Sequence, residues 1–580
     1  MATRLNLDNP YSLFAKTKLP SKSVWQTFEK QDSLTKKIAS ELDCSELVAQ
    51  LLLNRTVSSI QEAKHFLNHE WSQWPPLPNQ EKSINIIKEL IASKAAICVY
   101  GDYDVDGVTS TAMMVDILRN AGCKVDYISP HRFNDGYGLN MNRMIEIAQK
   151  KYTALITLDC GISNKKEIAK LKELHPDIII LILDHHKCPN ELPNANAIVN
   201  PQLADQNHPA RYLCSAALVD YIFRTTPIEG IDPNQYLDLT AIGLVGDVMP
   251  LTKLNRWYVK KGLEAIQTKP RETILELCIS ARVNHQKITT QDIGFGIGPR
   301  LNAPGRLGDP RPVVELLLSS DAAEIKRQIQ AIEQLNNKRR SIGEKIQIDI
   351  DNQIKENNAI SEEKGIIISG ELWHMGIIGI NASKLVNRFN KPAVVIGFEN
   401  EIARGSARSV PGVNIYQILS KCADMLDHFG GHSQAAGFSL NPKNIIEFKK
   451  EFIKNCNEIK EEETVAKIKI DAELPLNQVS LTTIKEIETL EPYGEGNPRP
   501  LFYTHANVIE ARKVGQTKAH IKFRLEQNNH ITDGIGFNLS EKMESIKTQQ
   551  VWLAFHISMN EFKGSITPQL EIIDIKGYGT

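Results

Sequence analysis

Short apolar runs alternate with segments of helical character between residues 84 and 251. This alternation is typical of an α/β domain whose sheet is mainly parallel. The predicted strands are residues 95–100, 124–128, 154–158 and 178–183. Three of these four strands end directly in clusters of acidic residues, at the edge where parallel sheets bind their ligands.

A long helical pattern follows. Isoleucine and leucine recur at helical spacing from residue 321 to about residue 357, which predicts a helix of about 50 Å at 1.5 Å per residue. Ser320 is its expected N-cap, and Gly343 weakens it. We interpret this helix as a connector to a second, smaller α/β lobe, with strands near residues 365–369 and 393–397.

The last part of the chain predicts an all-β domain. The charged stretch 460–464 is interpreted as a linker. Alternating β-type runs such as 501–508 and 520–525 follow, and about 110 residues of this kind fit a barrel or sandwich. The expected divisions are an N-terminal extension (1–80), a catalytic α/β domain (81–255), a segment with the connecting helix (256–360), the second α/β domain (361–460) and the all-β domain (465–580).

Composition is compatible with several globular domains. The chain has 580 residues, of which 42% are hydrophobic and 24% are charged. No apolar run approaches the roughly 18 residues of a membrane span, and residues 1–14 lack a basic stretch followed by an apolar core. We therefore expect a cytoplasmic protein with no membrane partner. The nine cysteines include no CxxC pair, so neither a disulfide framework nor a thiolate zinc site is indicated.

Four acidic motifs follow predicted strand or helix ends. The first contains Asp102, Asp104 and Asp106, three carboxylates whose mutual repulsion a cation would offset. The others are Asp159, the run Asp184-His185-His186, and Asp247. Each motif alone is a weak signal, because solvated acidic turns are common and an isolated histidine pair is more often structural.

Together the motifs predict a metal centre, because all of them would lie on one rim of one sheet. Carboxylates with one or two imidazoles favour Mn²⁺ or Mg²⁺ over zinc. Two such ions about 3.5–4 Å apart are the usual apparatus for in-line attack on phosphorus. The candidate ligands are Asp102, Asp104, Asp106, Asp159, His185, His186 and Asp247.

The motif order resembles a known family. DYDVDG, LDCG, LDHH and GDVMPL look like the signature motifs of the DHH phosphoesterase superfamily. Downstream, GPRLNAPGR (298–306), GSARS (405–409) and GGH (430–432) resemble motifs of its RecJ family of bacterial exonucleases. The resemblance covers nearly the whole chain. It implies a parallel-sheet DHH domain joined by a long helix to a smaller α/β DHHA1 domain, then an all-β OB-fold domain.

The resemblance also implies an activity and its residues. The activity is metal-dependent degradation of single-stranded DNA from 5′ to 3′, to 5′-mononucleotides, in recombination and repair. Asp104, Asp159 and His186 are the expected catalytic residues, with His186 near the scissile phosphate. The implied metal ligands are Asp102, Asp104, Asp159, His185 and Asp247, with Asp106 a weaker or outer ligand. Tyr100 stands where many DHH enzymes have a histidine, which leaves the occupancy of one metal site open.

Positive charge for binding DNA must be local, because the net charge is -1. Arginine presents a planar fork to phosphate, and by resemblance Ser406 and Arg408 would hold the terminal 5′-phosphate. Lys518 and Lys522 belong to a basic strip of the barrel, where Phe523 and Phe537 are possible stacking platforms but more often core residues. The predicted DNA and 5′-phosphate ligands are Arg132, Arg300, Asn302, Arg306, Ser406, Arg408, Gly431, His432, Lys518 and Lys522.

Three alternatives stay open. A phosphodiesterase for short oligoribonucleotides or cyclic dinucleotides would generally lack the C-terminal barrel. A non-catalytic single-strand binding relative would have lost ligands, whereas all the expected acids are present. A metabolic metalloenzyme would not need the arginines at 300–311 and 404–408. By resemblance, the expected partners are single-stranded DNA, single-strand binding protein and a helicase, and the expected state is a monomer.

Overall fold

The structure is a computed structural model that describes residues 23–55, 57–68, 74–546, 550–562 and 564–577. The chain divides into two compact units. Unit 1 is Met1–Thr56, Lys338–Thr489 and Pro500–Thr580, and unit 2 is Val57–Asn337 and Leu490–Arg499. Residues 1–14, where no secretory signal is expected, lie outside the described residues. Within the described ranges, every helix is too short or too polar to cross a bilayer.

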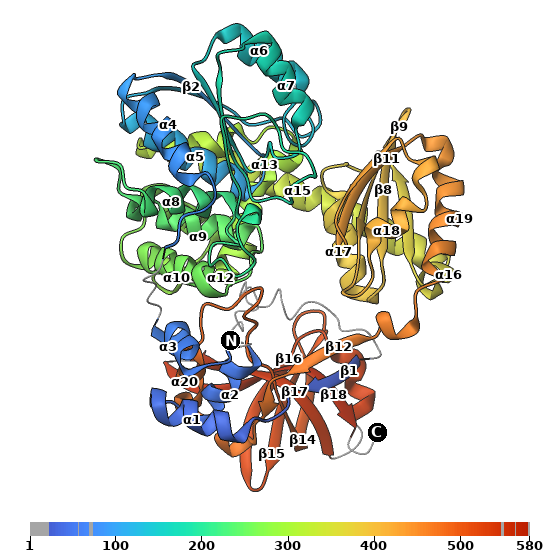
Figure 1. Ribbon diagram of the computed structural model, residues 1–580. Helices are drawn as coiled ribbons and strands as arrows, with labels where there is room; N and C mark the ends of the chain where they lie inside the picture. Colours follow the sequence, from blue (N-terminus) through green and yellow to red (C-terminus); the bar gives the residue numbers. More distant parts are fainter. Residues whose placement is uncertain (1–22, 56, 69–73, 547–549, 563, 578–580) are drawn as a thin grey trace. The chain divides into compact units, whose positions relative to one another are not determined.

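Unit 2 contains a five-stranded, entirely parallel sheet in the order β3-β2-β4-β5-β6 (Figure 1). Its strands are β2 (Ala96–Gly101), β3 (Lys124–Ile128), β4 (Ala154–Leu158), β5 (Ile179–Leu183) and β6 (Ala197–Val199). The first four lie within one residue of the predicted strands. The three-residue β6 is too short to leave a recognisable apolar run, and it was not predicted.

Helices cover both faces of this sheet. Along β2, Val99 contributes to the core under α5 and α8, whereas Cys98 contributes to the core under α6 and α7, because successive strand residues point to opposite faces. The helices of unit 2 are α3 (Ile60–Asn68), α4 (Gln80–Ala92), α5 (Val105–Asn120), α6 (Met141–Lys150), α7 (Lys165–Leu174), η2 (Pro201–Leu203), α8 (Ser215–Thr225), η3 (Pro233–Tyr236), α9 (Leu237–Gly246), α10 (Lys253–Thr268), α11 (Glu272–Ala281), η4 (His285–Lys287), α12 (Thr290–Asp292), the π-helix η5 (Ile293–Ile297), α13 (Gly298–Leu307) and α14 (Arg311–Leu318).

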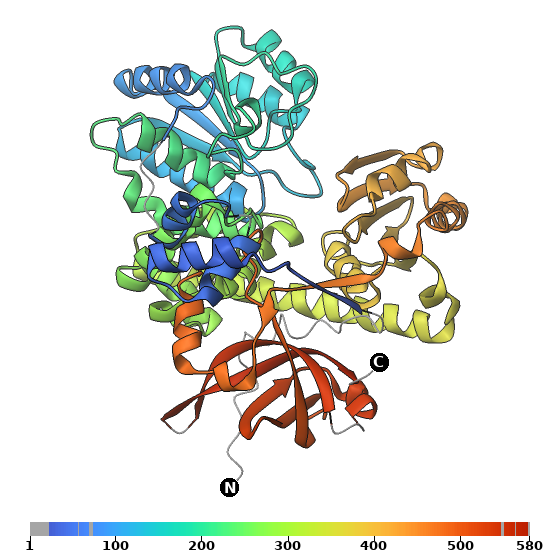
Figure 2. The ribbon, with the colours of Figure 1, turned by 60° about the horizontal axis from the view of Figure 1, so that its bottom comes forward.

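The predicted connecting helix is α15 (Ala322–Glu356), which is continuous from unit 2 into unit 1 (Figure 2). Its predicted N-cap, Ser320, is wrong: the Asp321 carboxylate instead accepts the Glu324 N–H at 2.8 Å, because it lies one residue closer to the first turn. The helix continues through Gly343, and a Cβ at that position would lie 3.5 Å from the Ile377 side chain.

The second α/β domain belongs to unit 1 and has a mixed sheet in the order β10-β11-β9-β8-β7. Only β7 and β8 are parallel. Its elements are α16 (Ala359–Glu362), β7 (Ile366–Glu371), α17 (Ile378–Phe389), β8 (Ala393–Glu399), β9 (Ile402–Arg408), α18 (Ile415–Ser420), η6 (Ala423–Met425), β10 (His428–Gly431), β11 (Ala435–Leu440), η7 (Pro442–Asn444) and α19 (Ile445–Cys456).

The C-terminal part of unit 1 is a β-barrel, because β14 pairs with both β15 and β17 and thereby closes the sheet β14-β15-β16-β18-β17. This arrangement fits an OB-fold. The elements are η8 (Glu461–Glu463), β12 (Ala466–Ile470), β13 (Ala472–Glu473), η9 (Leu476–Gln478), α20 (Leu481–Glu488), β14 (Phe502–Val514), β15 (His520–Gln527), β16 (His530–Gly536), η10 (Ser540–Ile546), β17 (Gln550–Phe562) and β18 (Ser565–Gly577).

The N-terminal residues of unit 1 pack with this barrel. Strand β1 (Ser23–Thr27) pairs in parallel with β12, and the two lie side by side in Figure 2 in dark blue and orange. Helices α1 (Asp32–Leu42) and α2 (Glu46–Asn54) follow. After α2, the Arg55 guanidinium forms a buried ion pair with Asp471 at 3.2 Å. This long-range pairing has no counterpart in the local sequence pattern.

Candidate metal centre

The four acidic motifs meet at the carboxyl edge of the sheet in unit 2. Asp102 follows β2, Asp159 follows β4, His185 lies two residues beyond β5, and Asp247 follows α9. The candidate ligand atoms form three groups, and the atoms within each group lie within 4.8 Å of one another. The groups are Asp102 with Asp104 and Asp159, Asp159 with His185 and His186, and Asp106 with His185 and Asp247. The predicted convergence of the motifs is therefore present.

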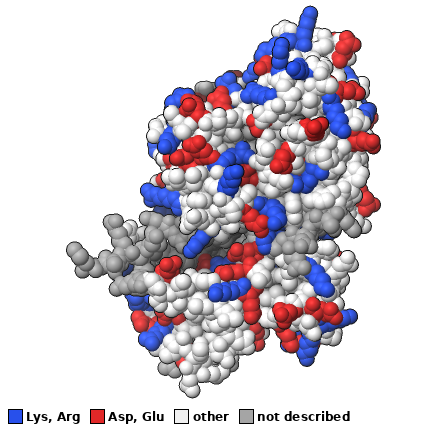
Figure 3. Space-filling model, turned by 90° about the vertical axis from the view of Figure 1, so that its left-hand side faces the viewer, with Lys and Arg blue, Asp and Glu red and all other residues white. Residues whose placement is uncertain are grey.

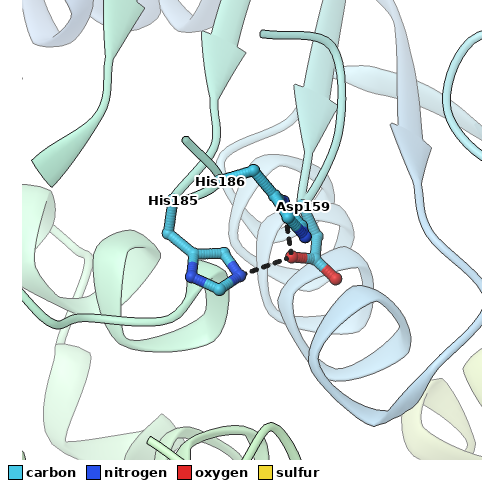
Figure 4. A group of neighbouring side chains, drawn as sticks. All are labelled: Asp159, His185 and His186. Carbon is cyan, nitrogen blue, oxygen red and sulfur yellow. Dashed lines mark ion pairs between the residues drawn. The ribbon is translucent and has the colours of Figure 1, made fainter. Parts of the chain in front are cut away.

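Asp159 is at the centre of the cluster. Figure 4 shows the imidazoles of His185 and His186 directed toward its carboxylate from the same loop. The distance from His185 Nε2 to Asp159 Oδ1 is 3.1 Å, and from the same nitrogen to Asp247 Oδ2 it is 3.5 Å. Asp159 has a φ of 61°, a left-handed conformation that is uncommon outside glycine and occurs often at functional sites.

The first motif is held by the ends of two helices. Asp104 caps α5, because its Oδ1 accepts the Gly107 N–H at 3.1 Å. Asp106 accepts the N–H groups of Ser215 and Ala216 at 2.6 and 2.9 Å, at the start of α8. Asp106 Oδ2 also lies 3.9 Å from His185 Nε2. Asp106 thus positions α8 as well as facing the cluster, and its role as an outer ligand stays a prediction.

His186 lies in a chain of hydrogen bonds. Its Nδ1 is 2.8 Å from Asp184 Oδ1, and its Nε2 is 3.0 Å from the hydroxyl of Tyr137. The Asp184 carboxylate can only accept, so His186 Nδ1 bears the proton in this contact. Burial alone would lower the pKa of His186, but the hydrogen bond to Asp184 and the surrounding carboxylates raise it to about 9.

The electrostatics of the cluster match a site for cations. Burial, followed by repulsion from Asp104, raises the pKa of Asp102 well above its usual value. Burial and repulsion from Asp106 and other carboxylates do the same for Asp159 and Asp247. Asp102 Oδ1 is buried and has no hydrogen-bond partner among the described residues. A divalent cation would satisfy this oxygen and remove the repulsion, so these residues fit Mn²⁺ or Mg²⁺.

His185 is suited to ligation for a related reason. Burial lowers the pKa of its imidazole from the ordinary value of 6.5. The ring is therefore neutral at pH 7, and a neutral ring nitrogen is the form that binds a metal.

The predicted DNA ligands of unit 2 lie on two segments. The Arg132 guanidinium carbon is 4.8 Å from the centre of the Tyr103 ring, in the first acidic motif. Asn302 and Arg306 are half-buried residues of α13. Arg300 also lies in α13, and its guanidinium binds the Glu333 carboxylate and the carbonyls of Gly296 and Ser280. These protein contacts occupy the side chain that we expected to bind phosphate.

The predicted 5′-phosphate ligands of unit 1 lie on β9 and at the end of β10. Arg408 Nη1 donates to Ser406 Oγ at 3.0 Å. A Cβ at Gly379, near the start of α17, would lie 2.9 Å from Ser406 Oγ and 3.1 Å from Arg408 Nη2. The side chains therefore adjoin the amino end of a helix, an arrangement that favours an anion. Gly431 ends β10 with a φ of 138°, and His432 follows it.

The predicted basic strip of the barrel is neutralised in part. Lys522 lies 3.7 Å from Asp533, and Lys518 is exposed in the turn before β15. Phe523 is buried in the barrel core, the position that the sequence favoured over a stacking platform. Phe537 packs edge-on against His520. On the face shown in Figure 3, basic and acidic side chains are interspersed, in line with the near-zero net charge.

The sequence interpretation gave no role to three residues of the cluster. Asp184 was named in its motif but not as the partner of His186, although a carboxylate next to a histidine pair is a natural partner for an imidazole. Ser215, whose hydroxyl donates to Asp159 at 3.2 Å, and Tyr137, which contacts His186, come from segments remote in sequence. No local pattern marks either of them.

Comparisons with known proteins match the fold and the site. Three family models match: the N-terminal domain of the DHH family over residues 96–244, the DHHA1 domain over residues 362–458, and the RecJ OB domain over residues 470–574. The chain therefore has the domain set of a DHH phosphoesterase with DHHA1 and OB domains.

Individual relatives show which family of DHH phosphoesterases the chain belongs to. The single-stranded-DNA-specific exonuclease RecJ of Haemophilus influenzae is 34% identical over 85% of this chain and 90% of the relative. That of Bacillus subtilis is 32% identical over 96% of this chain and 71% of the relative. The crystal structure of RecJ in complex with Mn²⁺ from Thermus thermophilus is 26% identical, with a TM-score of 0.83 over 96% of this chain and 80% of that chain. The chain belongs to the RecJ family.

Proposed function

We propose that this protein is a metal-dependent, single-stranded-DNA-specific exonuclease. The observation that supports it most is the convergence of Asp159, His185 and Asp247 on one rim, in a chain whose relatives are named for this activity. We include in the proposal degradation from 5′ to 3′ to 5′-mononucleotides, and a role in recombination and repair. The proposed partners are single-strand binding protein and a helicase that supplies the unwound strand. The enzyme is proposed to be monomeric and cytoplasmic.

Two cations would be held by the carboxylates and His185. The proposed ligands are Asp102, Asp104, Asp159, His185 and Asp247, with Asp106 outside them. When bound, divalent cations lower the pKa of a water molecule and neutralise charge on the phosphate oxygens.

The side chains around the ligands fix the geometry. Asp184 holds a proton on His186 Nδ1 and so fixes the ring, whose other nitrogen is directed away from Asp184 toward Tyr137. His186 is proposed to contact the scissile phosphate from this position. Ser215 and the start of α8 hold the carboxylates of Asp159 and Asp106. Such preorganisation means that little rearrangement is needed when charge develops on phosphorus.

The terminal 5′-phosphate is proposed to bind the basic residues. In unit 1, Ser406, Arg408 and the start of α17 form one anion-binding arrangement. In unit 2, Arg132 and Arg306 are further proposed ligands for phosphates of the strand. A fixed phosphate at the end of the strand would explain why degradation begins at a terminus.

The test is degradation of a 5′-phosphorylated single strand, labelled separately at each end, with Mn²⁺, with Mg²⁺ and with chelator. We expect metal-dependent release of labelled mononucleotide from the 5′ end, with duplex spared. D159A should abolish turnover while leaving the fold and DNA binding largely intact. Binding without cleavage by the unmodified protein would contradict the proposal, and so would cleavage confined to very short RNA or cyclic dinucleotides.

A further inference from the structure

We propose that Phe295 is a stacking platform for a base of the bound strand, beside the metal centre. This inference rests on the proposed function, because it names a binding site for the nucleobase of that substrate. It concerns a residue outside the acidic motifs and outside the predicted phosphate ligands.

Phe295 is the outward-facing residue of the π-helix η5. Ile293 and Ile297 on either side of it are fully buried, whereas 39% of the Phe295 surface is exposed. The two isoleucines lie one turn apart and enter the core, so the residue midway between them points the opposite way. Short π-helices are rare and occur frequently at functional sites.

The turn that presents Phe295 is held on both sides. Upstream, Thr289 and Asp292 form a reciprocal cap, with the Thr289 N–H and Oγ1 both bound to the Asp292 carboxylate. Downstream, Arg300 Nη1 donates to the Gly296 carbonyl at 2.7 Å, while its Nε binds Glu333 at 2.7 Å. Through these two contacts Arg300 connects the π-helix to Glu333 on α15. A rigid turn lowers the entropic cost of ordering an aromatic ring against a ligand.

The π-helix lies against the helix that ends at the metal centre. A Cβ at Gly294 would lie 3.9 Å from Val245 Cγ1 on α9, two residues before the proposed ligand Asp247. Val248 is 66% exposed and has a φ of 55°, a genuine outlier for a β-branched residue. Exposed apolar side chains therefore occur on η5, which contacts α9, and directly after Asp247 at the end of α9, and strain of this kind clusters at functional sites.

A nucleobase is the ligand that these features favour. The phosphates of a strand are drawn to the cations and arginines, whereas its bases offer flat apolar faces to an aromatic ring. Stacking is tolerant of sequence because every base has such a face. Asn302 and Arg306, proposed phosphate contacts, lie on α13, which continues directly from η5. A strand running along this segment would have phosphate and base contacts from one continuous helical segment.

The experiment compares four variants of the full chain on 5′-phosphorylated single strands. F295A removes the ring, F295W restores a stacking face, and F295L restores apolar volume without one. L174A, which truncates an exposed leucine 44% accessible at the end of α7, is the matched control. We expect KM to rise roughly 5- to 150-fold in F295A, with kcat within about twofold. F295W should resemble the unmodified protein, F295L should resemble F295A, and L174A should show no change.

Strands with one abasic residue at successive positions near the 5′ end locate the contact. At one position, loss of the base should raise KM for the unmodified protein as much as F295A does, and should have little further effect on F295A. The proposal is overturned if F295A degrades the normal strand like the unmodified protein, or if F295L restores KM as well as F295W does. It is also overturned if the F295A defect follows a lowered melting temperature, since the ring would then be a packing residue.

A measurement of DNA affinity tests the Phe295 site independently of the proposed nuclease activity. Fluorescence anisotropy with a labelled strand in chelator measures affinity without any cleavage. If the unmodified protein does not degrade DNA, the proposed function fails, yet the Phe295 site is still tested by the affinity ratio of F295A to F295W. If degradation occurs and the two variants bind equally, only the Phe295 inference fails.

Discussion

The Arg132 guanidinium lies over the Tyr103 ring, with 4.8 Å between the guanidinium carbon and the ring centre. Tyr103 stands between the proposed ligands Asp102 and Asp104. Its backbone is packed closely, because a Cβ at Gly305 of α13 would lie 2.4 Å from the Tyr103 carbonyl oxygen. The Arg132 N–H donates to the Gly308 carbonyl at 3.1 Å. One tyrosine therefore connects the metal-binding loop with a proposed phosphate ligand.

Replacing Tyr103 should weaken recognition of the 5′-phosphate. Y103L removes the cation–π contact, which contributes about 0.5–2 kcal/mol, so the preference for 5′-phosphorylated over 5′-hydroxyl strands should fall by roughly 2- to 30-fold. Y103F keeps the ring and should keep the preference. The measurement is kcat/KM on both strands. An equal loss of this preference in Y103L and Y103F would show that the ring does not position Arg132. A further variant, R132M, tests whether Arg132 recognises the phosphate.

Neutralising Asp102 should stabilise the metal-free protein and weaken its response to metal. In D102N one of several repelling buried charges is removed, so the melting temperature in chelator should rise by a few degrees. Its further rise on adding Mn²⁺ should shrink, because a ligand that binds only the folded state stabilises it in proportion to affinity. D177N, at an exposed position, is the control and should change neither value. A lower melting temperature for D102N in chelator would contradict the cation-site interpretation.

Breaking the buried pair of Arg55 with Asp471 should destabilise unit 1. The side chains are 2% and 7% exposed, so R55M leaves a buried carboxylate without its cation. The expected loss is about 3–5 kcal/mol in the free energy of unfolding, measured by urea denaturation followed by circular dichroism. R388M removes an exposed pair with Asp351 and should cost less than about 1 kcal/mol. Equal effects of the two variants would mean that the buried pair is not a structural link.

Asp574 should make the free energy of unfolding of the barrel decrease as the pH falls into the acid range. Burial alone would raise its pKa, but hydrogen bonds from Lys542, Ser23 and Trp25 hold the pKa of this carboxyl below its usual value. A lowered folded-state pKa gives stability that is complete above the unfolded value, about 3.9, and is lost as pH falls through the folded value. Unfolding measured from pH 6 to pH 2 should show D574N less stable at pH 6, with the difference disappearing toward pH 2. A constant difference would contradict this assignment.

Local patterns predicted the elements that bear the metal centre. Strands β2, β4 and β5 are apolar runs buried on both faces, whereas the edge strand β3 alternates exposed and buried residues. The positions of all four follow from the sequence within one residue. The long helix followed from its isoleucine spacing in the same way. The N-cap was wrong by one residue, since Ser320 and Asp321 both have suitable side chains and only the backbone geometry selects between them.

Other features depend on contacts between distant segments. Strand β1 pairs with β12 more than four hundred residues away, and the sequence of β1 contains no signal for that partner. Arg300 has a guanidinium whose chemistry allows it to bind phosphate, carboxylate or carbonyl oxygens. The folded chain places Glu333 and the Gly296 carbonyl beside it, and that placement alone gives Arg300 its structural contacts.

The sequence by itself determined which ligand types are present and that each follows a strand or a helix, because apolar runs and acidic motifs are local properties. Only the tertiary structure decided that the carboxylates and imidazoles approach within 4.8 Å, that Ser215 and Tyr137 join them, and that Phe295 faces outward. These are distances between segments far apart in the chain. They are fixed by the packing of the sheet against its helices, which no local pattern encodes.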